Sequence, residues 1–291
     1  MRSSLAPCAM AVLTVLSLAA CGDDGSDGAD VSTGSAATAD GTAAPSPSPP
    51  TTAVAAGIQH PLGAEDVVLS VGYEGGFVPV GVSFANLPTL LVTGDGTAIV
   101  TGAQTAIYPG PMLPNLQQGR LDEATIQELL RSAQQHGLLA AVEYPRNDMI
   151  ADASDLVVRI QADGGTYEHR AYALGFEDET DPARGALAAF VVDATAATDD
   201  VMAPVTAYES DAFLIQARPV TPEELGDEVP PSIVPWPADQ PVRLVDASVC
   251  ATVPWADGEA LFVDATQVTL FDDAGTTYQI TAVPRLPGRS C

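Results

Sequence analysis

The chain has 291 residues, a length that suits one large domain or two small ones. Its 38 acidic and 11 basic residues give a formal charge of −27 at pH 7, and every basic residue is an arginine. Without a cluster of cations the chain cannot bind nucleic acid, and without lysine it has no phosphate-loop, Schiff-base or serine–lysine chemistry. A solvated acidic surface accounts for the charge; recognition of a cationic partner is the alternative.

The first twenty residues have the pattern of an export signal. Arg2 gives a positive start, and the apolar run from Leu5 to Ala20 is too short for a comfortable membrane span. The run ends in Leu18-Ala19-Ala20-Cys21, which resembles the lipobox of bacterial lipoproteins. The resemblance implies that residues 1–20 are a signal peptide and that acylated Cys21 anchors the mature chain to a lipid bilayer outside the cytoplasm. The alternative is an ordinary secretory signal in which Cys21 is incidental.

Residues 21–58 are rich in Gly, Asp, Ser, Thr, Ala and Pro and contain no aromatic residue. Such a composition cannot bury enough apolar surface to fold, so the segment is predicted to be a disordered tether. A tether of this length spans about 30–40 Å on average.

Residues 59–225 are predicted to form an α+β domain. The stretch "TLLVTGDGTAIVT" predicts a hairpin with a two-residue turn at Asp95-Gly96. A helix follows, with Asp122 as its N-cap and Gly137 at its end. Its apolar face consists of Ile126, Leu129, Leu130 and Ala133.

A second hairpin is predicted in "LVVRIQADGGTYEHRAYAL", with Asp163-Gly164 at the turn. This register pairs Val158 with His169 on an apolar face and Arg159 with Glu168 on the other face. A second helix is predicted after Asp181, its cap, with Pro182 in its first position. Its apolar stripe consists of Leu187, Phe190, Val191 and Ala194.

The stretch "AFLIQARPV" predicts a strand, and Thr221 and Glu224 are spaced for a capping box on a short helical turn. The order of hairpins, helices and strand favours an antiparallel sheet with two main helices on one face. A proline-rich connector is predicted at 226–241. A small β subdomain is predicted at 242–291, with strands in "VRLVDASVCATV", "EALFVDA" and "QVTLFDDAGTTYQITAV".

Two late cysteines remain once the leader is set aside, Cys250 and Cys291. An exported compartment permits a disulfide, and with two candidates its connectivity is unambiguous. A metal pair is disfavoured because no histidine lies near them in the sequence. We therefore expect a disulfide that staples the C-terminal β unit, with two free thiols as the alternative.

Several phrases in the folded part carry a second resemblance. The stretches "YEGGFVP", "AIYPGPMLPNL", "RAYALG" and "RLPGRSC" resemble those of uncharacterised secreted lipoproteins of high-GC actinobacteria. The lack of lysine and the bias toward alanine and aspartate fit such a genome. The resemblance implies a lineage and an envelope location, and no activity comes with it.

Motifs that carry chemistry are missing from the sequence: there is no G-x-S-x-G elbow, no H-E-x-x-H helix and no G-x-G-x-x-G turn. Among the three histidines only His169 invites a functional interpretation, as a base or a ligand, and a hydrogen-bonded core histidine is favoured over it. The acids from Glu177 to Asp181 suit a helix N-terminus better than a calcium site. No catalytic, cofactor-binding or metal-binding residue is predicted.

Tyr108 and Trp236 lie in proline-rich loops, which can present aromatic side chains for recognition. They are the candidate recognition surface, with the edge of the core as the alternative place for each ring. The leading hypothesis is a non-catalytic lipoprotein that binds an envelope protein or polymer. The alternatives are a carboxylate-dependent hydrolase, which needs two carboxyl groups about 5–10 Å apart in a cleft, and an inhibitor of an exported enzyme, which needs a rigid protruding loop.

Overall fold

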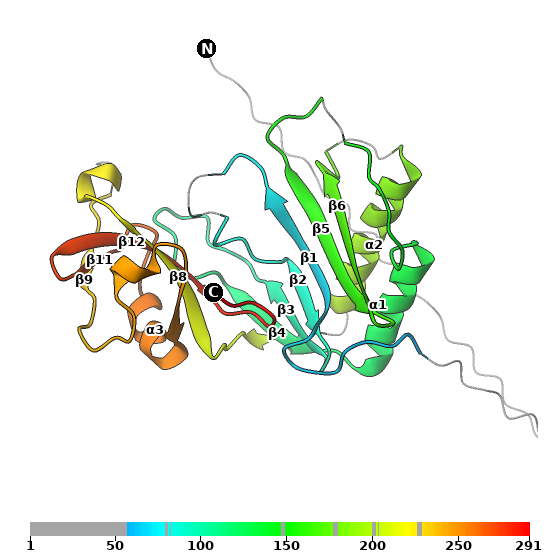
Figure 1. The fold of residues 1–291 in the computed structure, drawn as a ribbon, viewed down its shortest axis with the longest axis horizontal. Helices are drawn as coiled ribbons and strands as arrows, with labels where there is room; N and C mark the ends of the chain where they lie inside the picture. Colours follow the sequence, from blue (N-terminus) through cyan, green and yellow to red (C-terminus); the bar gives the residue numbers. More distant parts are fainter. Residues whose placement is uncertain are drawn as a thin grey trace, which may run out of the picture. The chain divides into compact units, whose positions relative to one another are not determined.

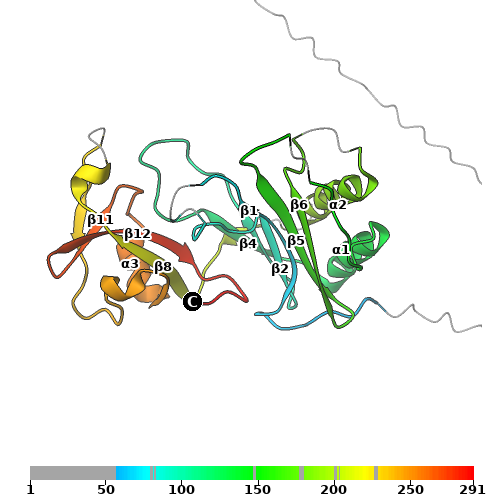
Figure 2. The same ribbon diagram turned by 45° about the horizontal axis from the view of Figure 1, so that its top comes forward.

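The computed structural model describes residues 57–78, 81, 83–146, 149–176, 180–199, 202, 204–225 and 229–291. The predicted signal peptide 1–20, Cys21 and most of the tether predicted at 21–58 lie outside these residues. Val54–Cys291 form one compact unit. The described part is α+β, with a seven-stranded antiparallel sheet, a five-stranded mixed sheet and three α-helices (Figure 1 and Figure 2).

The larger sheet has the strand order β6-β5-β1-β2-β3-β4-β7, and all its neighbouring strands are antiparallel. Its strands are β1 (Val67–Gly75), β2 (Leu90–Thr93), β3 (Thr97–Thr101), β4 (Leu116–Arg120), β5 (Ser154–Ala162), β6 (Gly165–Tyr172) and β7 (Thr206–Ala207). Two helices, α1 (Glu123–Gln135) and α2 (Pro182–Asp199), pack on one face and share a core with it (Figure 1). This arrangement confirms the predicted antiparallel sheet with two main helices on one face.

Local signals place the ends of α1 where the sequence predicts them. The Asp122 carboxylate accepts a hydrogen bond of 2.8 Å from the Thr125 backbone N–H, as an N-cap does. At the other end Gly137 has φ +76°, and the Leu138 N–H donates to the Ala133 carbonyl at 2.8 Å. The bond from Leu138 belongs to a Schellman motif, which satisfies carbonyls that the last helical turn leaves unpaired.

The start of α2 follows the same logic. The Asp181 carboxylate accepts hydrogen bonds of 3.0 Å from the backbone N–H groups of Ala183 and Arg184. Leu187, Phe190 and Ala194 are fully buried, as predicted, while Val191 is only partly buried at the edge of the same core. The acids at 177–179 lie outside the described residues.

The β5–β6 hairpin has the predicted register: Val158 lies opposite His169, and Arg159 lies opposite Glu168. The turn residues Asp163 and Gly164 have φ angles of +50° and +75°, which is the conformation a two-residue hairpin turn requires. Because side chains alternate along a strand, this register sends the Val158 side of β5 to the helices and the Arg159 side away from them.

The β2–β3 hairpin is present, but the predicted two-residue turn at Asp95-Gly96 is wrong. The turn contains three residues, 94–96, since Val92 pairs with Ala98. The Asp95 carboxylate accepts hydrogen bonds from the Thr93 hydroxyl at 2.6 Å and from the Thr97 backbone N–H at 3.1 Å. These side-chain bonds, together with Gly96 at φ +89°, stabilise the longer loop.

The smaller sheet has the strand order β10-β8-β12-β11-β9, in which only β9 and β11 run parallel. Its strands are β8 (Ala212–Pro219), β9 (Ile233–Pro235), β10 (Ala251–Pro254), β11 (Leu270–Asp273) and β12 (Thr276–Pro284). The helix α3 (Trp255–Phe262) and the 3-10 turns η1 (Pro222–Leu225) and η2 (Leu244–Ala247) complete this part. A second core, rich in aromatic side chains, lies here.

Four expectations for this region are wrong. The strand "AFLIQARPV" is β8 of the second sheet, not of the first, and the connector contributes β9. The stretch "EALFVDA", predicted as a strand, ends helix α3 instead, and in "VRLVDASVCATV" the turn η2 precedes a strand, β10, that begins only at Ala251. Trp255 and Phe262, two helical turns apart, both pack on Phe213 of β8, so tertiary contacts override the local strand pattern.

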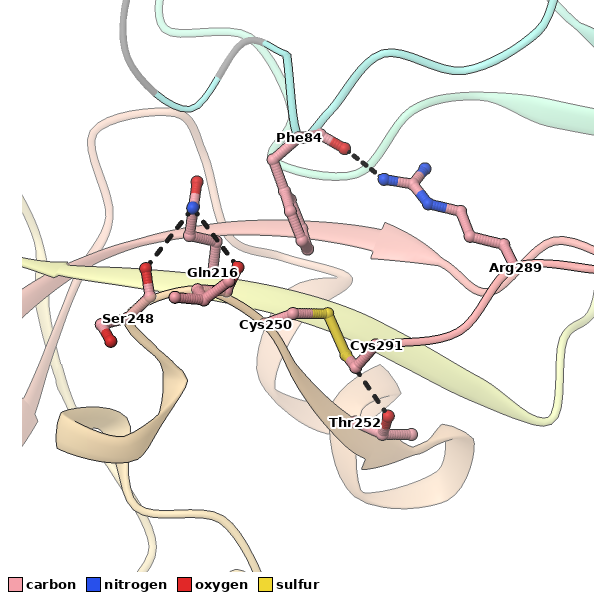
Figure 3. The surroundings of a disulfide bond; sticks show 8 residues. Phe84, Gln216, Ser248, Cys250, Thr252, Arg289 and Cys291 are labelled. Carbon is pink, nitrogen blue, oxygen red and sulfur yellow. Dashed lines mark hydrogen bonds between the residues drawn. A yellow bond between two sulfur atoms is a disulfide. The ribbon is translucent and has the colours of Figure 1, made fainter.

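The expected disulfide between Cys250 and Cys291 is present, with an S–S distance of 2.00 Å and a Cα–Cα distance of 5.4 Å. It joins the residue just before β10 to the segment that follows β12 (Figure 3). The β subdomain is therefore stapled as predicted, although it shares its sheet with β8 and β9.

Candidate binding cleft

The two aromatic residues proposed as a recognition surface lie in different environments. Tyr108 is 60% exposed, in a loop whose base is held by backbone hydrogen bonds from Met112 to Ala265 (2.9 Å) and from Gln267 to Gly110 (3.0 Å). Trp236 is only 5% exposed and lies in the core of the smaller sheet, where its indole N–H donates to the Val242 carbonyl at 2.8 Å. Trp236 is therefore a core residue, as the alternative placement of its ring expected, and it is not part of an exposed recognition surface.

His169 is a core residue rather than a catalytic base. It is fully buried, and its Nε2 lies 2.8 Å from the Leu138 carbonyl, so this nitrogen must carry a proton. Its Nδ1 accepts from the Tyr144 hydroxyl at 2.8 Å. Burial lowers the pKa of His169 and raises the pKa of Tyr144 to about 12. Both ring nitrogens are thus used in hydrogen bonds within the core.

The helix-free face of the larger sheet carries a network of ion pairs. Arg159 contacts Glu74 at 2.8 Å and Glu168 at 2.8 Å, and Arg170 contacts Glu74 at 2.6 Å and Asp155 at 3.1 Å. The hydrogen bond from Arg159 is the main reason that the pKa of Glu74 lies below its usual value. A carboxylate held ionised in this way is a poor general acid.

Beside this network lies a cleft of about 530 Å³, within the size range of small-ligand sites. Strands β1, β2 and β5 and the start of β6 contribute to its lining, together with residues 83–88 and the segment 286–289 after β12. Glu74 is the only carboxylate among the described residues that line it. The cleft thus lacks the pair of carboxyl groups that the hydrolase alternative needs.

Polar side chains in this cleft have unused hydrogen-bonding capacity. Ser70, Tyr73, Gln161 and Thr166 line the cleft, and within the described part of the chain their side chains form no hydrogen bond. They lie among apolar side chains that include Leu87, Val157 and Leu286. An apolar surface with a few available polar groups is typical of a site that binds a ligand.

The segment 286–289 is fixed at both ends. On one side Arg285 forms ion pairs with Asp211 at 2.7 Å and with Glu65 at 3.0 Å. On the other side Cys291 is bonded to Cys250. Between them Arg289 donates to the Phe84 carbonyl at 2.6 Å, and its guanidinium lies 5.5 Å from the centre of the Phe84 ring (Figure 3). The cleft is therefore lined by a rigid segment rather than by a free chain end.

Within the described ranges, no group of three His, Cys, Asp or Glu side chains is placed to hold a metal ion. None of the helices in those ranges has the length and apolar character needed to cross a membrane. Comparisons with protein-family models, with curated proteins and with solved structures find no match to this chain. Because these comparisons find no match, a function for this chain has to be argued from the cleft and its residues.

Sequence reasoning missed this cleft and its residue Arg289. Arg289 lies two positions before Cys291, so the expected disulfide placed it near Cys250 but gave no sign of Phe84, 205 residues earlier. Gln161 was recognisable only as a polar position in a predicted strand, and Ser70 lies in β1, which was not predicted. Their convergence depends on the pairing of β1 with β5, which is a long-range contact.

Proposed function

We propose that this protein is a lipid-anchored extracytoplasmic binding protein of the cell envelope. Acylated Cys21 holds it on a bilayer, the tether at 21–58 separates the folded part from that surface, and the cleft takes an envelope component. The role is non-catalytic. The observation that carries the proposal is the cleft itself, with unpartnered polar side chains on an apolar surface. The Cys250–Cys291 disulfide supports an extracytoplasmic location, because such bonds persist in oxidising compartments.

The anchor is tested by growing producing cells with an alkyne-bearing fatty acid and comparing Cys21→Ser with Cys8→Ser. We expect the label on the wild-type protein and on Cys8→Ser, whose cysteine lies outside the lipobox pattern. Cys21→Ser is expected to lose the label and to leave the membrane fraction. Undiminished labelling of Cys21→Ser contradicts the anchor.

The cleft is tested by measuring how much full-length protein sediments with envelope fragments of the producing cells. Thr166→Trp places a large side chain at the cleft, on the exposed strand β6. Thr206→Trp makes the same change on β7, the strand at the opposite edge of the sheet. We expect binding to fall in Thr166→Trp and to persist in Thr206→Trp; equal binding by both variants contradicts the cleft as the site.

The inhibitor alternative rests on the loop that carries Tyr108. Ile107 and Tyr108 are 68% and 60% exposed, and the backbone bonds to residues 265–267 hold the loop that presents them. A Tyr108→Ala variant in the same sedimentation assay separates the two proposals. If this variant loses binding and Thr166→Trp retains it, the loop is the site and the inhibitor role is favoured.

A further inference from the structure

The inference concerns the ligand class and rests on the proposed binding role. Most arginines of this acid-rich chain contact acidic side chains. Ion pairs with carboxylates of the described residues are formed by Arg120, Arg159, Arg170, Arg218, Arg243 and Arg285. Arg289, which lines the cleft, contacts no carboxylate among the described residues. Its partners are the carbonyl and ring of Phe84.

The Arg289 charge is partly shielded from water. Burial lowers the pKa of this guanidinium, whereas contacts with carboxylates raise the pKa of Arg159 and Arg285. A partly desolvated cation without a counter-ion is unfavourable until an anion approaches it. A ligand carboxylate would supply that anion through charge-assisted hydrogen bonds, which are stronger than neutral ones.

The position of this charge is set before any ligand binds. The Phe84 carbonyl uses a single N–H of the guanidinium, so further donors remain for a ligand. The disulfide two residues later and the Arg285 ion pairs hold the surrounding segment in place. A side chain ordered in advance loses less conformational entropy when it binds.

The rest of the cleft suits a ligand with hydroxyl groups. Ser70, Gln161 and Thr166 come from three neighbouring strands, with Gln161 directly opposite Thr166 and Ser70 opposite Arg159. Hydroxyl and amide groups both donate and accept, and so do sugar hydroxyls. Apolar surface from Leu87, Pro88 and Leu286 lies beside them and can pack against the apolar C–H face of a sugar ring.

Backbone pairing disfavours an extended peptide as the ligand. A peptide that adds to a sheet needs a strand edge with free N–H and C=O groups. Around Ser70, β1 is paired on both sides, with β2 and with β5, and β5 is paired with β1 and β6, so the backbone groups of Ser70 and Gln161 are already used. These two positions therefore offer side chains to the ligand, which favours recognition of a sugar.

We propose that the cleft binds a carboxylated sugar of an envelope glycan, with Arg289 on the carboxylate and Ser70, Gln161 and Thr166 on the hydroxyl groups. Because Arg289 forms no ion pair with an acid of the described residues, the carboxylate is the group that the site distinguishes. A neutral sugar of the same shape leaves the guanidinium uncompensated and binds more weakly.

The test is calorimetric titration of the full-length protein with trigalacturonic acid and with its methyl ester, which removes the charge and adds one small methyl group to each carboxyl. We expect the acid to bind at least about tenfold more tightly than the ester, with an affinity that falls as salt rises. Arg289→Gln is expected to lose at least about tenfold toward the acid, and Arg289→Lys to retain an intermediate affinity. Arg131→Gln makes the same charge change on the exposed face of α1 and is expected to bind as the wild type does.

A second variant guards against a folding defect in Arg289→Gln, since Arg289 also holds Phe84. Gln161→Ala removes a hydroxyl-binding amide without touching that contact and is expected to weaken both sugars alike. Equal binding of acid and ester, or undiminished binding by a folded Arg289→Gln, overturns the inference. Failure of both sugars to bind also overturns it, while sedimentation with envelope fragments continues to decide the proposed binding role separately. Arg289-dependent binding of a peptide carboxylate in place of the sugar overturns the sugar assignment.

Discussion

The two faces of the seven-stranded sheet differ in what covers them. Helices α1 and α2 bury one face in a continuous apolar core. The other face carries the ion pairs of Arg159 and Arg170 and the cleft beside them. Neighbouring residues of one strand therefore lie in different surroundings, one in the apolar core and the next at the cleft of the proposed ligand. Mutations on the two faces should differ in how far they change the stability of the protein.

The largest difference is expected between two adjacent residues of β5. Ile160 is 1% exposed beneath the helices, and its truncation to alanine is expected to lower the free energy of unfolding by about 2–5 kcal/mol. Gln161 lines the cleft, and Gln161→Ala is expected to change it by less than about 0.5 kcal/mol. Urea denaturation of the two variants measures both values. Similar losses in both would remove the distinction between the faces.

The next effect concerns the segment that borders the cleft. Cys291→Ser removes the disulfide and is expected to lower the unfolding free energy by about 2–4 kcal/mol, because the unfolded chain gains freedom. It also frees the segment that carries Arg289, so hydrogen exchange should rise at residues 285–290. Thr252→Ser, a mild change beside Cys291, serves as the control. Unchanged exchange in Cys291→Ser would show that the ion pairs of Arg285 suffice.

The covered face should also respond to acid before the open face does. Because burial lowers the pKa of His169, the unfolded state binds its proton first, and stability is lost as the pH falls below the ordinary value of 6.5. Thermal melting from pH 8 to pH 5 is expected to show this decline. His169→Gln, whose amide can replace both hydrogen bonds, is expected to flatten it. A slope that persists in this variant would assign the decline to another group.

The smallest effect belongs to the ion pairs of the open face. The pKa of Glu74 is lowered, so its contribution is present above the ordinary value of 4.5 and is lost as the pH falls through the folded value. Since the pairs are partly exposed, the loss is expected to be below about 1 kcal/mol. Glu74→Gln should remove this part of the acid dependence below pH 4.5 and leave the decline near 6.5 intact. A change in the loss of stability near pH 6.5 in Glu74→Gln would show that Glu74 on the open face and His169 on the covered face are energetically coupled.

Sequence reasoning succeeded where the determinants are local. Asp122, Gly137 and the Asp163-Gly164 turn act within a few residues, and the structure places each as predicted. It failed where distant partners decide the outcome. Phe213 packs against Trp255 and Phe262 of helix α3, where a strand was predicted for Phe262. Strand β8 pairs with β10 and β12 rather than with the larger sheet. For Trp236 the sequence left recognition and the edge of the core as alternatives, because the residues that surround its ring come from other segments.

The Glu65–Arg285 ion pair joins residues 220 positions apart, one near the start of β1 and the other just after β12. Contacts of such high sequence separation form late in folding, because a long loop must close before they appear. The cleft is bordered by residues from both ends of this loop. A ribosome-bound chain that has not yet released residue 289 therefore lacks the segment that borders the cleft, and the cleft is complete only after the whole folded unit has emerged.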